Sequence, residues 1–359
     1  MPRLFEPLTL RDLTLRNRVT MSPMCTYSCE TRDGQAGDWH LQHLASRAAG
    51  GVGLVLSEAT AVEPCGRISP EDLGLWDDGQ VDGLRRVTRA VQAQGAAFGV
   101  QLAHAGRKAG TYRPWAASRG VASAADGGWP DRVVGPTAER FSDATATPLA
   151  LDVEGLRTLV QAFAAAAVRA DAAGVDVIEL HAAHGYLLHA FLSPLVNTRD
   201  DAYGGDEAGR SRLLFEVVEA VRAVWPPAKP LLVRVSASDW AAAGWDADAT
   251  VRLARTLAER GVDLIDCSSG GAVAGVPIAA HPNYQVSFAE RVRREAGVAS
   301  AAVGQIADPR QADAIVAEGR ADLVLLGKAL LRDPYWAVHA AEALGAPPPW
   351  ARQYAWALG

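Results

Sequence analysis

The chain has 359 residues, of which 49% are apolar and 21% charged, and its formal net charge is −6. This size and composition are typical of a globular protein that buries a large core. The acidic balance argues against nucleic acid or an anionic membrane as the main partner, because both attract basic surfaces.

The cysteines and the N-terminal residues indicate the compartment. The spacing of Cys25, Cys29, Cys65 and Cys267 matches neither a zinc motif nor a disulfide framework. Free thiols in a reducing compartment are the simpler interpretation. The opening MPRLFEPLTL lacks the basic and apolar regions of a secretory signal, and no apolar run is long enough to span a bilayer. We therefore expect a cytoplasmic protein.

In chain order, residues 1–17 predict a short hairpin, and short apolar runs then alternate with longer amphipathic segments. The expected strands are 19–21, 52–59, 98–102, 175–180, 231–235, 264–267, 301–304 and 323–326. The expected helices are 40–49, 81–94, 153–173, 212–224, 247–260, 286–296, 309–318 and 335–344. Eight strand–helix units predict one domain, 1–359, folded as an α/β (β/α)8 TIM barrel. An open doubly wound sheet is the alternative.

The stretch 107–150, after the third strand, is rich in Gly, Pro and small residues and is long for a loop. Long irregular loops in compact domains tend to be functional. Because it follows a strand, we expect it to overhang the end of the barrel where function resides.

Glycines after the last strands suggest an anion site. Gly304–Gln305 and Gly327–Lys328 follow strands seven and eight, where barrels commonly bind phosphate through free backbone N–H groups. Tight turns with no ligand are the alternative. No GxGxxG or P-loop motif is present, so a mononucleotide is the expected ligand.

The segment His181-Ala-Ala-His184-Gly-Tyr186 follows strand four. Two imidazoles and a nearby phenol can hold a carbonyl oxygen and donate a proton beside it. The pair could instead ligate a metal ion or be structural.

Five blocks resemble the old yellow enzyme family: MSPMCTYS, QLAHAGRKA, HAAHGYLLHAFLSPLVNTRDDAYGG, RVSASDW and GKALLRDPYW. They are most similar to the bacterial branch with a cysteine after strand one, called thermophilic-like, which includes xenobiotic reductases. The resemblance covers essentially the whole chain.

The resemblance implies non-covalent FMN at the barrel mouth, with NADPH, or else NADH, as reductant. The implied FMN contacts are Pro23, Met24, Cys25, Ala59, Gln101, Arg234, Gly304, Gln305, Gly327 and Lys328. Gln101 is expected at the pyrimidine edge, and Arg234 near N1 and O2, where a guanidinium favours the reduced anion. Lys328 stands where the family usually has Arg, and losing the bidentate fork predicts weaker FMN retention.

The resemblance also implies reduction of the C=C bond of α,β-unsaturated carbonyl or nitro compounds. His181 and His184 would hold the electron-withdrawing group, hydride would come from flavin N5, and Tyr186 would donate the proton. Tyr27 and Cys25 would contact substrate, although Cys25 could instead be a small buried apolar residue. The role of Lys108 is open, with a structural ion pair as one alternative.

The C-terminus departs from the family. Several close relatives end in Gln-Tyr-x-Arg-Gly-Trp and place that arginine in a neighbouring active site, whereas this chain has Trp356 near its end. Trp356 is expected as an aromatic wall of its own or a neighbouring active site, or else as a surface residue at a dimer contact. A homodimer or homotetramer is expected by analogy.

Three other functions fit parts of the pattern. A Schiff-base aldolase would use Lys108 or Lys328. A dienoyl-CoA reductase shares the barrel but carries an iron–sulfur cysteine cluster that is not seen here. A flavin-binding sensor would lack turnover.

Overall fold

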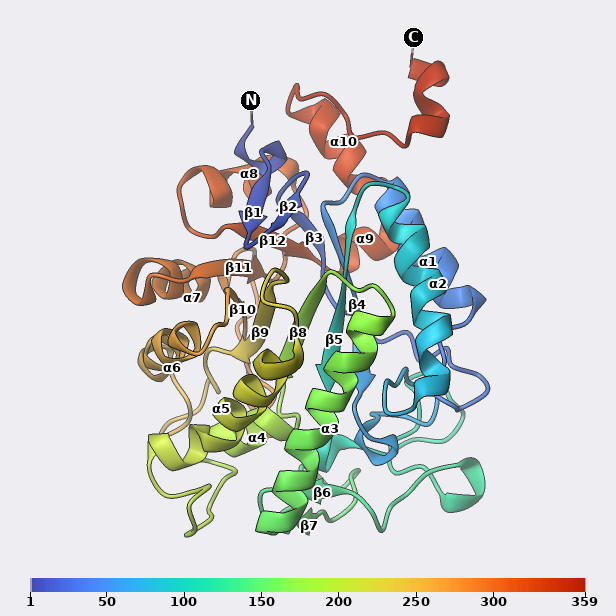
Figure 1. The fold of residues 1–359 in the computed structure, drawn as a ribbon. Helices are drawn as coiled ribbons and strands as arrows, with labels where there is room; N and C mark the ends of the chain where they lie inside the picture. Colours follow the sequence, from blue (N-terminus) through green and yellow to red (C-terminus); the bar gives the residue numbers. More distant parts are fainter. Residues whose placement is uncertain (1, 359) are drawn as a thin grey trace.

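The computed structural model describes residues 2–358, and at its centre eight parallel strands close into a barrel (Figure 1). The strands are β3 (Val19–Met21), β4 (Leu54–Ala61), β5 (Ala97–Ala103), β8 (Val177–Ala182), β9 (Leu231–Ser236), β10 (Leu264–Ser268), β11 (Ala299–Val303) and β12 (Leu323–Leu326). Each pairs with the next, and β12 closes onto β3. Their nearly continuous apolar runs fit strands buried on both faces. The predicted (β/α)8 fold is confirmed, and the open sheet was wrong.

Helices surround the barrel (Figure 1). They are α1 (Asp38–Ala49), α2 (Val81–Gln92), α3 (Val153–Ala172), α5 (Glu207–Val224), α6 (Ala247–Glu259), α7 (Val286–Arg291) with the π-helix η6 (Val292–Ala296), α8 (Pro309–Ala317) and α10 (Trp336–Ala343). Aspartates cap several N-termini: Asp152, Asp206, Asp246 and Asp308 accept backbone N–H bonds there. No helix within residues 2–358 has the length and apolar character needed to cross a lipid bilayer.

Two short helices were not predicted, α4 (Leu187–Leu192) and α9 (Lys328–Arg332). Each has too few residues to show a helical period in the sequence. The chain also forms 3-10 helices: η1 (Arg3–Phe5), η2 (Pro64–Gly66), η3 (Asp78–Gln80), η4 (Gly106–Lys108), η5 (Ala124–Asp126) and η7 (Arg352–Leu358).

The N-terminal hairpin and the long loop lie at opposite ends of the barrel (Figure 1). The hairpin consists of β1 (Leu8–Leu10) and β2 (Leu13–Leu15), and it packs Leu10 and Leu15 against the first residues of barrel strands, such as Leu54 and Leu264. The long loop contains the small strand pair β6 (Val134–Gly135) and β7 (Leu149–Ala150). The hairpin therefore closes the barrel at the end where the strands begin. The long loop borders the opposite end, the mouth, where the strands end.

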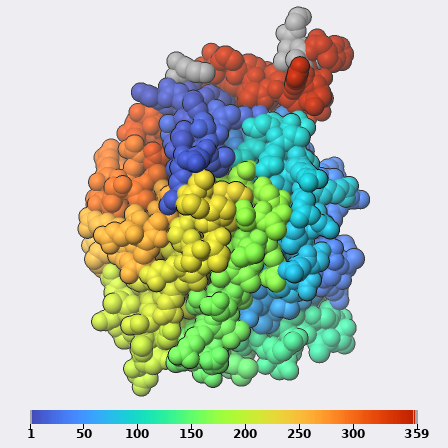
Figure 2. All heavy atoms as spheres, in the orientation of Figure 1, coloured from blue at the N-terminus to red at the C-terminus, as the bar shows by residue number. Residues whose placement is uncertain are grey.

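The C-terminal segment η7 projects from the hairpin end of the barrel (Figures 1 and 2). Within it, Trp356 is 86% exposed. Trp356 therefore does not line the cavity of its own chain, and that part of the prediction was wrong, because η7 follows α10 away from the mouth. A contact with a neighbouring copy stays a prediction.

Candidate active site

The predicted site residues meet at the carboxyl ends of the barrel strands. A cavity of about 220 Å³ opens there. It is lined by Pro23, Cys25, Tyr27, Ala59, Gln101, His181, His184, Tyr186 and Arg234. The last residues of β4, β5, β8 and β9 and the segments after β3 and β8 thus contribute to one concave site, as expected for this end of a barrel.

A second and larger cavity, of about 730 Å³, lies beside the ends of β11 and β12. Its lining includes all four predicted phosphate residues, Gly304, Gln305, Gly327 and Lys328, together with Tyr284, Asp308 and Arg332. A Cβ on Gly327 would meet only the sulfur of Met24, at 3.5 Å. Met24, which was predicted to line a flavin, lies beside Gly327 but is not among the residues that line either cavity. Arg332 is a second cation that sequence reasoning missed.

Strand register aligns the ionisable residues inside the barrel. Gln101 is paired with Glu179, while His181 and Asp266 flank Arg234 on either side. Residues two apart on a strand face the same side, so Glu179 and His181 both point inward. The regular pairing of neighbouring strands therefore places these ionisable side chains next to one another inside the barrel.

The two imidazoles and the phenol form a compact group. The ring centroid of His181 lies 5.1 Å from that of His184 and 4.9 Å from that of Tyr186. Burial, followed by the nearby charge of Arg234, holds the pKa of both histidines well below the usual range. Burial also raises the pKa of Tyr186 well above its usual value. At neutral pH the group is two neutral imidazoles and a protonated phenol.

Hydrogen bonds determine which ring nitrogens remain available. Nδ1 of His181 accepts the N–H of Ala183 at 3.2 Å, so Nε2 carries the hydrogen and is free to donate. Nε2 of His184 is paired with the Ser268 hydroxyl at 2.7 Å. No group of three or more metal-ligand atoms within residues 2–358 includes either histidine. The arrangement favours oxyanion binding over a metal site.

The turn that carries His184 is held by Lys108. His184 and Gly185 both have left-handed backbone, with φ of 60° and 74°. The Lys108 ammonium donates to the carbonyl of His184 at 2.6 Å and to that of Gly271 at 2.8 Å. It makes no ion pair within the described chain, so the predicted structural ion pair was wrong. Burial lowers the pKa of Lys108 to about 8.

A buried histidine–aspartate pair supports the same turn, and the sequence analysis missed it. Nδ1 of His189 accepts the N–H of Gly185 at 2.8 Å, and its Nε2 lies 3.0 Å from the Asp239 carboxylate. Asp239 also accepts from Ser193 and from the backbone of Trp245. His189 and Asp239 are both fully buried as side chains. This pair acts through the turn, as positioning residues.

We expect His189→Leu to lower the free energy of unfolding by about 1.5–3 kcal/mol, because a buried carboxylate and a backbone N–H lose their partner. His339→Leu is the matched control, since His339 pairs with Asp333 at 2.8 Å but is largely exposed. The control should change stability by less than about 0.5 kcal/mol. Urea unfolding of the holoenzymes measures both, and equal effects would show that the buried pair does not support the turn.

Arg234 has a buried partner that the sequence analysis did not identify. Its Nε lies 3.0 Å from a carboxylate oxygen of Asp266, and its Nη1 donates to Ser22 at 3.2 Å. Nearby, Nε2 of Gln101 donates to Glu179 at 2.8 Å, which leaves the amide oxygen and the second N–H of Gln101 available. Burial, followed by the charge of Asp266, raises the pKa of Glu179 to about 8. Glu179 is therefore protonated at neutral pH.

We expect Glu179→Gln to make folding less dependent on pH. In the wild type the folded chain keeps a proton on Glu179 between the ordinary carboxyl pKa of 4.5 and about 8, whereas the unfolded chain has lost it. Stability therefore falls as pH rises through this window, by up to about 1.4 kcal/mol per unit. Urea unfolding at about pH 5.5 and about pH 7.5 tests this. Parallel losses in wild type and variant would contradict the assignment.

The two other acidic side chains in the cavity lining, Cys25 and Tyr27, are also protonated at neutral pH. Burial raises the pKa of Cys25 well above the usual thiol value, and nearby Asp72 and Glu58 add to the effect. Burial likewise raises the pKa of Tyr27. Cys25 is thus a neutral thiol in the cavity wall. All four cysteines are free, as predicted.

Comparison with known proteins gives one consistent result. A family model described as NADH:flavin oxidoreductase / NADH oxidase matches residues 3–346. The NADPH dehydrogenase of Geobacillus sp. (strain WCH70) is 48% identical over 342 residues, which are 95% of this chain and 94% of the relative. The NADPH dehydrogenase of Bacillus subtilis (strain 168) is 46% identical over 352 residues, 98% of each chain.

Solved structures agree with these sequence matches. Morphinone reductase superposes with a TM-score of 0.78 at 29% identity, covering 97% of this chain and 91% of that one. The old yellow enzyme homologue from Zymomonas mobilis gives a TM-score of 0.78 at 26% identity, covering 97% and 94%.

Proposed function

The chain belongs to the NADH:flavin oxidoreductase / NADH oxidase family, that of the old yellow enzymes, and we propose that it reduces activated carbon–carbon double bonds. It is an FMN-dependent NADPH dehydrogenase, with FMN bound non-covalently and NADPH as reductant. The substrates we propose are α,β-unsaturated carbonyl and nitro compounds.

The residues at the mouth fit FMN. Arg234 lines the cavity as a cation, and one oxygen of the nearby Glu179 is buried without a hydrogen bond inside the described chain. The free amide oxygen of Gln101 suits an N–H donor on a pyrimidine edge. Lys328 and Arg332 supply positive charge in the cavity that we assign to the phosphate. Pro23, Met24, Cys25 and Ala59 would then contact the ring.

In the mechanism we propose, bound FMN supplies the hydride acceptor and donor between NADPH and substrate. His181 and His184 donate hydrogen bonds to the carbonyl or nitro oxygen, where negative charge grows in the transition state. Because both imidazoles are neutral, they donate without giving up a full proton. Tyr186 delivers a proton to the α-carbon, and Tyr27 positions the substrate.

The observation that carries this proposal is the grouping of His181, His184 and Tyr186 in one cavity with Arg234. The test is anaerobic incubation of the holoenzyme with NADPH and 2-cyclohexenone, followed by product analysis. We expect cyclohexanone, with one NADPH consumed for each molecule formed. Formation of the allylic alcohol, or no enone-dependent NADPH consumption, would overturn the proposal.

Lys328→Arg is expected to tighten FMN retention by about tenfold, the effect of one added charge-assisted hydrogen bond. The reason is that a guanidinium can bind two phosphate oxygens at once, whereas an ammonium acts as a point charge. Release of FMN on dilution or dialysis measures it. Lys229→Arg is the control, because Lys229 pairs with Asp171 outside both cavities. Unchanged release from the Lys328 variant would argue against a phosphate contact.

We also propose a homodimer or homotetramer in which Trp356 contacts a neighbouring copy. Support comes from the high exposure of its indole on a projecting segment. Such an aromatic surface is typical of interfaces.

A further inference from the structure

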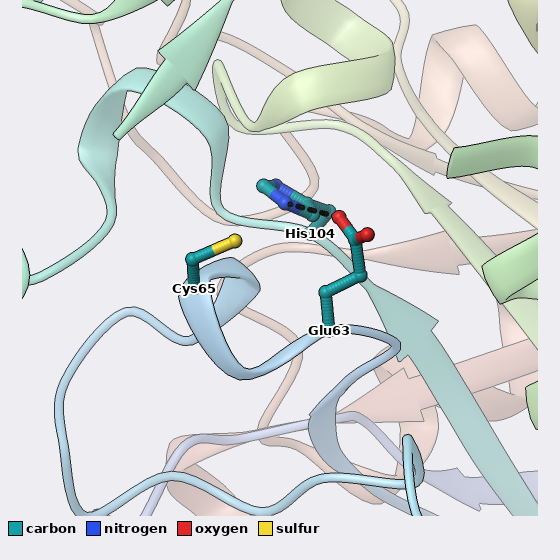
Figure 3. Close-up of side chains that lie close together, drawn as sticks. All are labelled: Glu63, Cys65 and His104. Atoms are coloured by element: carbon teal, nitrogen blue, oxygen red, sulfur yellow. Dashed lines mark ion pairs between the residues drawn. The ribbon is translucent and has the colours of Figure 1, made fainter. Parts of the chain in front are cut away.

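A second cluster of reactive groups lies outside the linings of the two cavities described above. Figure 3 shows its three side chains close together. Glu63 and Cys65 belong to the turn after β4, and His104 follows β5. A carboxylate oxygen, the thiol sulfur and an imidazole nitrogen all lie within 4.8 Å of one another. None of the three residues has a role in the proposed reaction.

The hydrogen bonding of His104 determines what this cluster can do. Nδ1 accepts the N–H of Gly106 at 3.0 Å, so the hydrogen of the neutral ring resides on Nε2. Nε2 points toward Glu63, 3.3 Å away (Figure 3), yet it is buried without a hydrogen bond of good geometry in the described chain. A metal ion would need a lone pair on Nε2, and the Gly106 contact opposes that tautomer. The cluster is thus better suited to stabilise an anion than to bind a cation.

We propose that Cys65 is the peroxide-sensitive thiol of this protein, with the buried N–H of His104 stabilising its thiolate and sulfenate forms. A thiolate beside such a donor is the reactive species toward oxidants. Burial alone would lower the pKa of His104, whereas the neighbouring Cys65 and Glu63 raise it. Because Nδ1 accepts the Gly106 N–H, the ring hydrogen that faces the cluster resides on Nε2.

The reaction is a two-electron oxidation by hydrogen peroxide. The Cys65 sulfur attacks one peroxide oxygen, the O–O bond breaks, and hydroxide leaves and takes up a proton to form water. Sulfur is oxidised to the sulfenic acid, and peroxide is reduced. Bound flavin, once reduced, would supply hydrogen peroxide wherever it meets dioxygen.

The other cysteines provide internal comparisons. Cys29 and Cys267 are buried. Cys25 is partly accessible, but burial raises its pKa well above the usual value, so it stays a thiol. Cys65 is partly accessible and has the buried imidazole beside it. Cys65 is also connected to the active site by packing. Its carbonyl accepts the Trp129 indole N–H at 2.9 Å, and Cys65 and Tyr186 both pack on the apolar cluster that contains Trp129.

The test is brief exposure of the FMN-bound protein to hydrogen peroxide with dimedone, followed by peptide mass spectrometry of all four cysteines. We expect dimedone on Cys65 on the order of tenfold faster than on any other cysteine. Cys65→Ser should abolish that label and leave the rest unchanged. Dominant labelling of Cys25, or equal slow labelling of all four, would overturn the proposal.

Two further measurements separate a reactive site from a structural one. Glu63→Gln should speed labelling of Cys65, because the carboxylate no longer competes for the His104 N–H or repels the thiolate. Glu30→Gln, which changes an exposed carboxylate paired with Arg113, should not. If the purified protein retained one zinc ion that Cys65→Ser released, the cluster would be a metal site and the proposal would be wrong.

Discussion

Tyr186→Phe is expected to slow reoxidation of the reduced enzyme by an enone about 10²- to 10⁴-fold, the usual contribution of a positioned general acid. Reduction by NADPH should keep its wild-type rate, because it needs no proton from this side chain. The phenol suits the role because burial raises its pKa and keeps it protonated. Its ring centroid also lies 4.9 Å from that of His181. Anaerobic stopped-flow absorbance separates the two half-reactions.

Tyr335→Phe is the matched control for this experiment. Tyr335 precedes α10, outside the residues that line either cavity, so losing its hydroxyl should leave both half-reactions unchanged. If Tyr186→Phe slowed both half-reactions equally, the hydroxyl would serve the cofactor site in general. Wild-type reoxidation in the variant would assign the proton to another donor.

Arg234→Met is expected to have the largest effect on stability and on FMN binding. Removing the guanidinium leaves the carboxylate of Asp266 buried and unpaired, which costs about 3–5 kcal/mol. The same substitution removes the only Lys or Arg among the described residues that line the cavity of about 220 Å³ at the mouth. Urea unfolding and FMN release measure the two losses separately.

The double variant Arg234→Met with Asp266→Asn distinguishes these effects. It removes the unpaired charge together with the arginine, so most of the lost stability should return, while FMN should still be released readily. Recovery of FMN retention in the double variant would mean that Arg234 acts only as a structural partner of Asp266. An unstable double variant would mean that the ion pair is not the source of the loss.

Periodicity and resemblance were sufficient to predict the barrel and the residues at its mouth. Every barrel strand was expected within about three residues of its place, because parallel strands buried on both faces appear as uninterrupted apolar runs. The rule that barrel function lies at the carboxyl ends then grouped residues as distant in sequence as Cys25 and Arg234. The roles of these residues remain proposals.

What the sequence analysis missed are partners that depend on three-dimensional register. Asp266 is the one charged residue in an apolar strand, as Arg234 is in the strand beside it, and their pairing follows from aligning β9 with β10. That signal was available. The contact of His189 with Asp239 joins a helix to a distant loop, and nothing in the local pattern indicates it. The position of Trp356 likewise depends on the path of the chain after α10.

The central claim is that one flavin serves NADPH and an alkene in turn at the same mouth. The most direct measurement is the colour of the holoenzyme without oxygen, first mixed with NADPH and then with 2-cyclohexenone. The account predicts that the yellow absorbance bleaches with NADPH and returns fully with the enone, and that His184→Ala retains only the bleaching. A protein that bleaches but regains its colour only when air is admitted would contradict it.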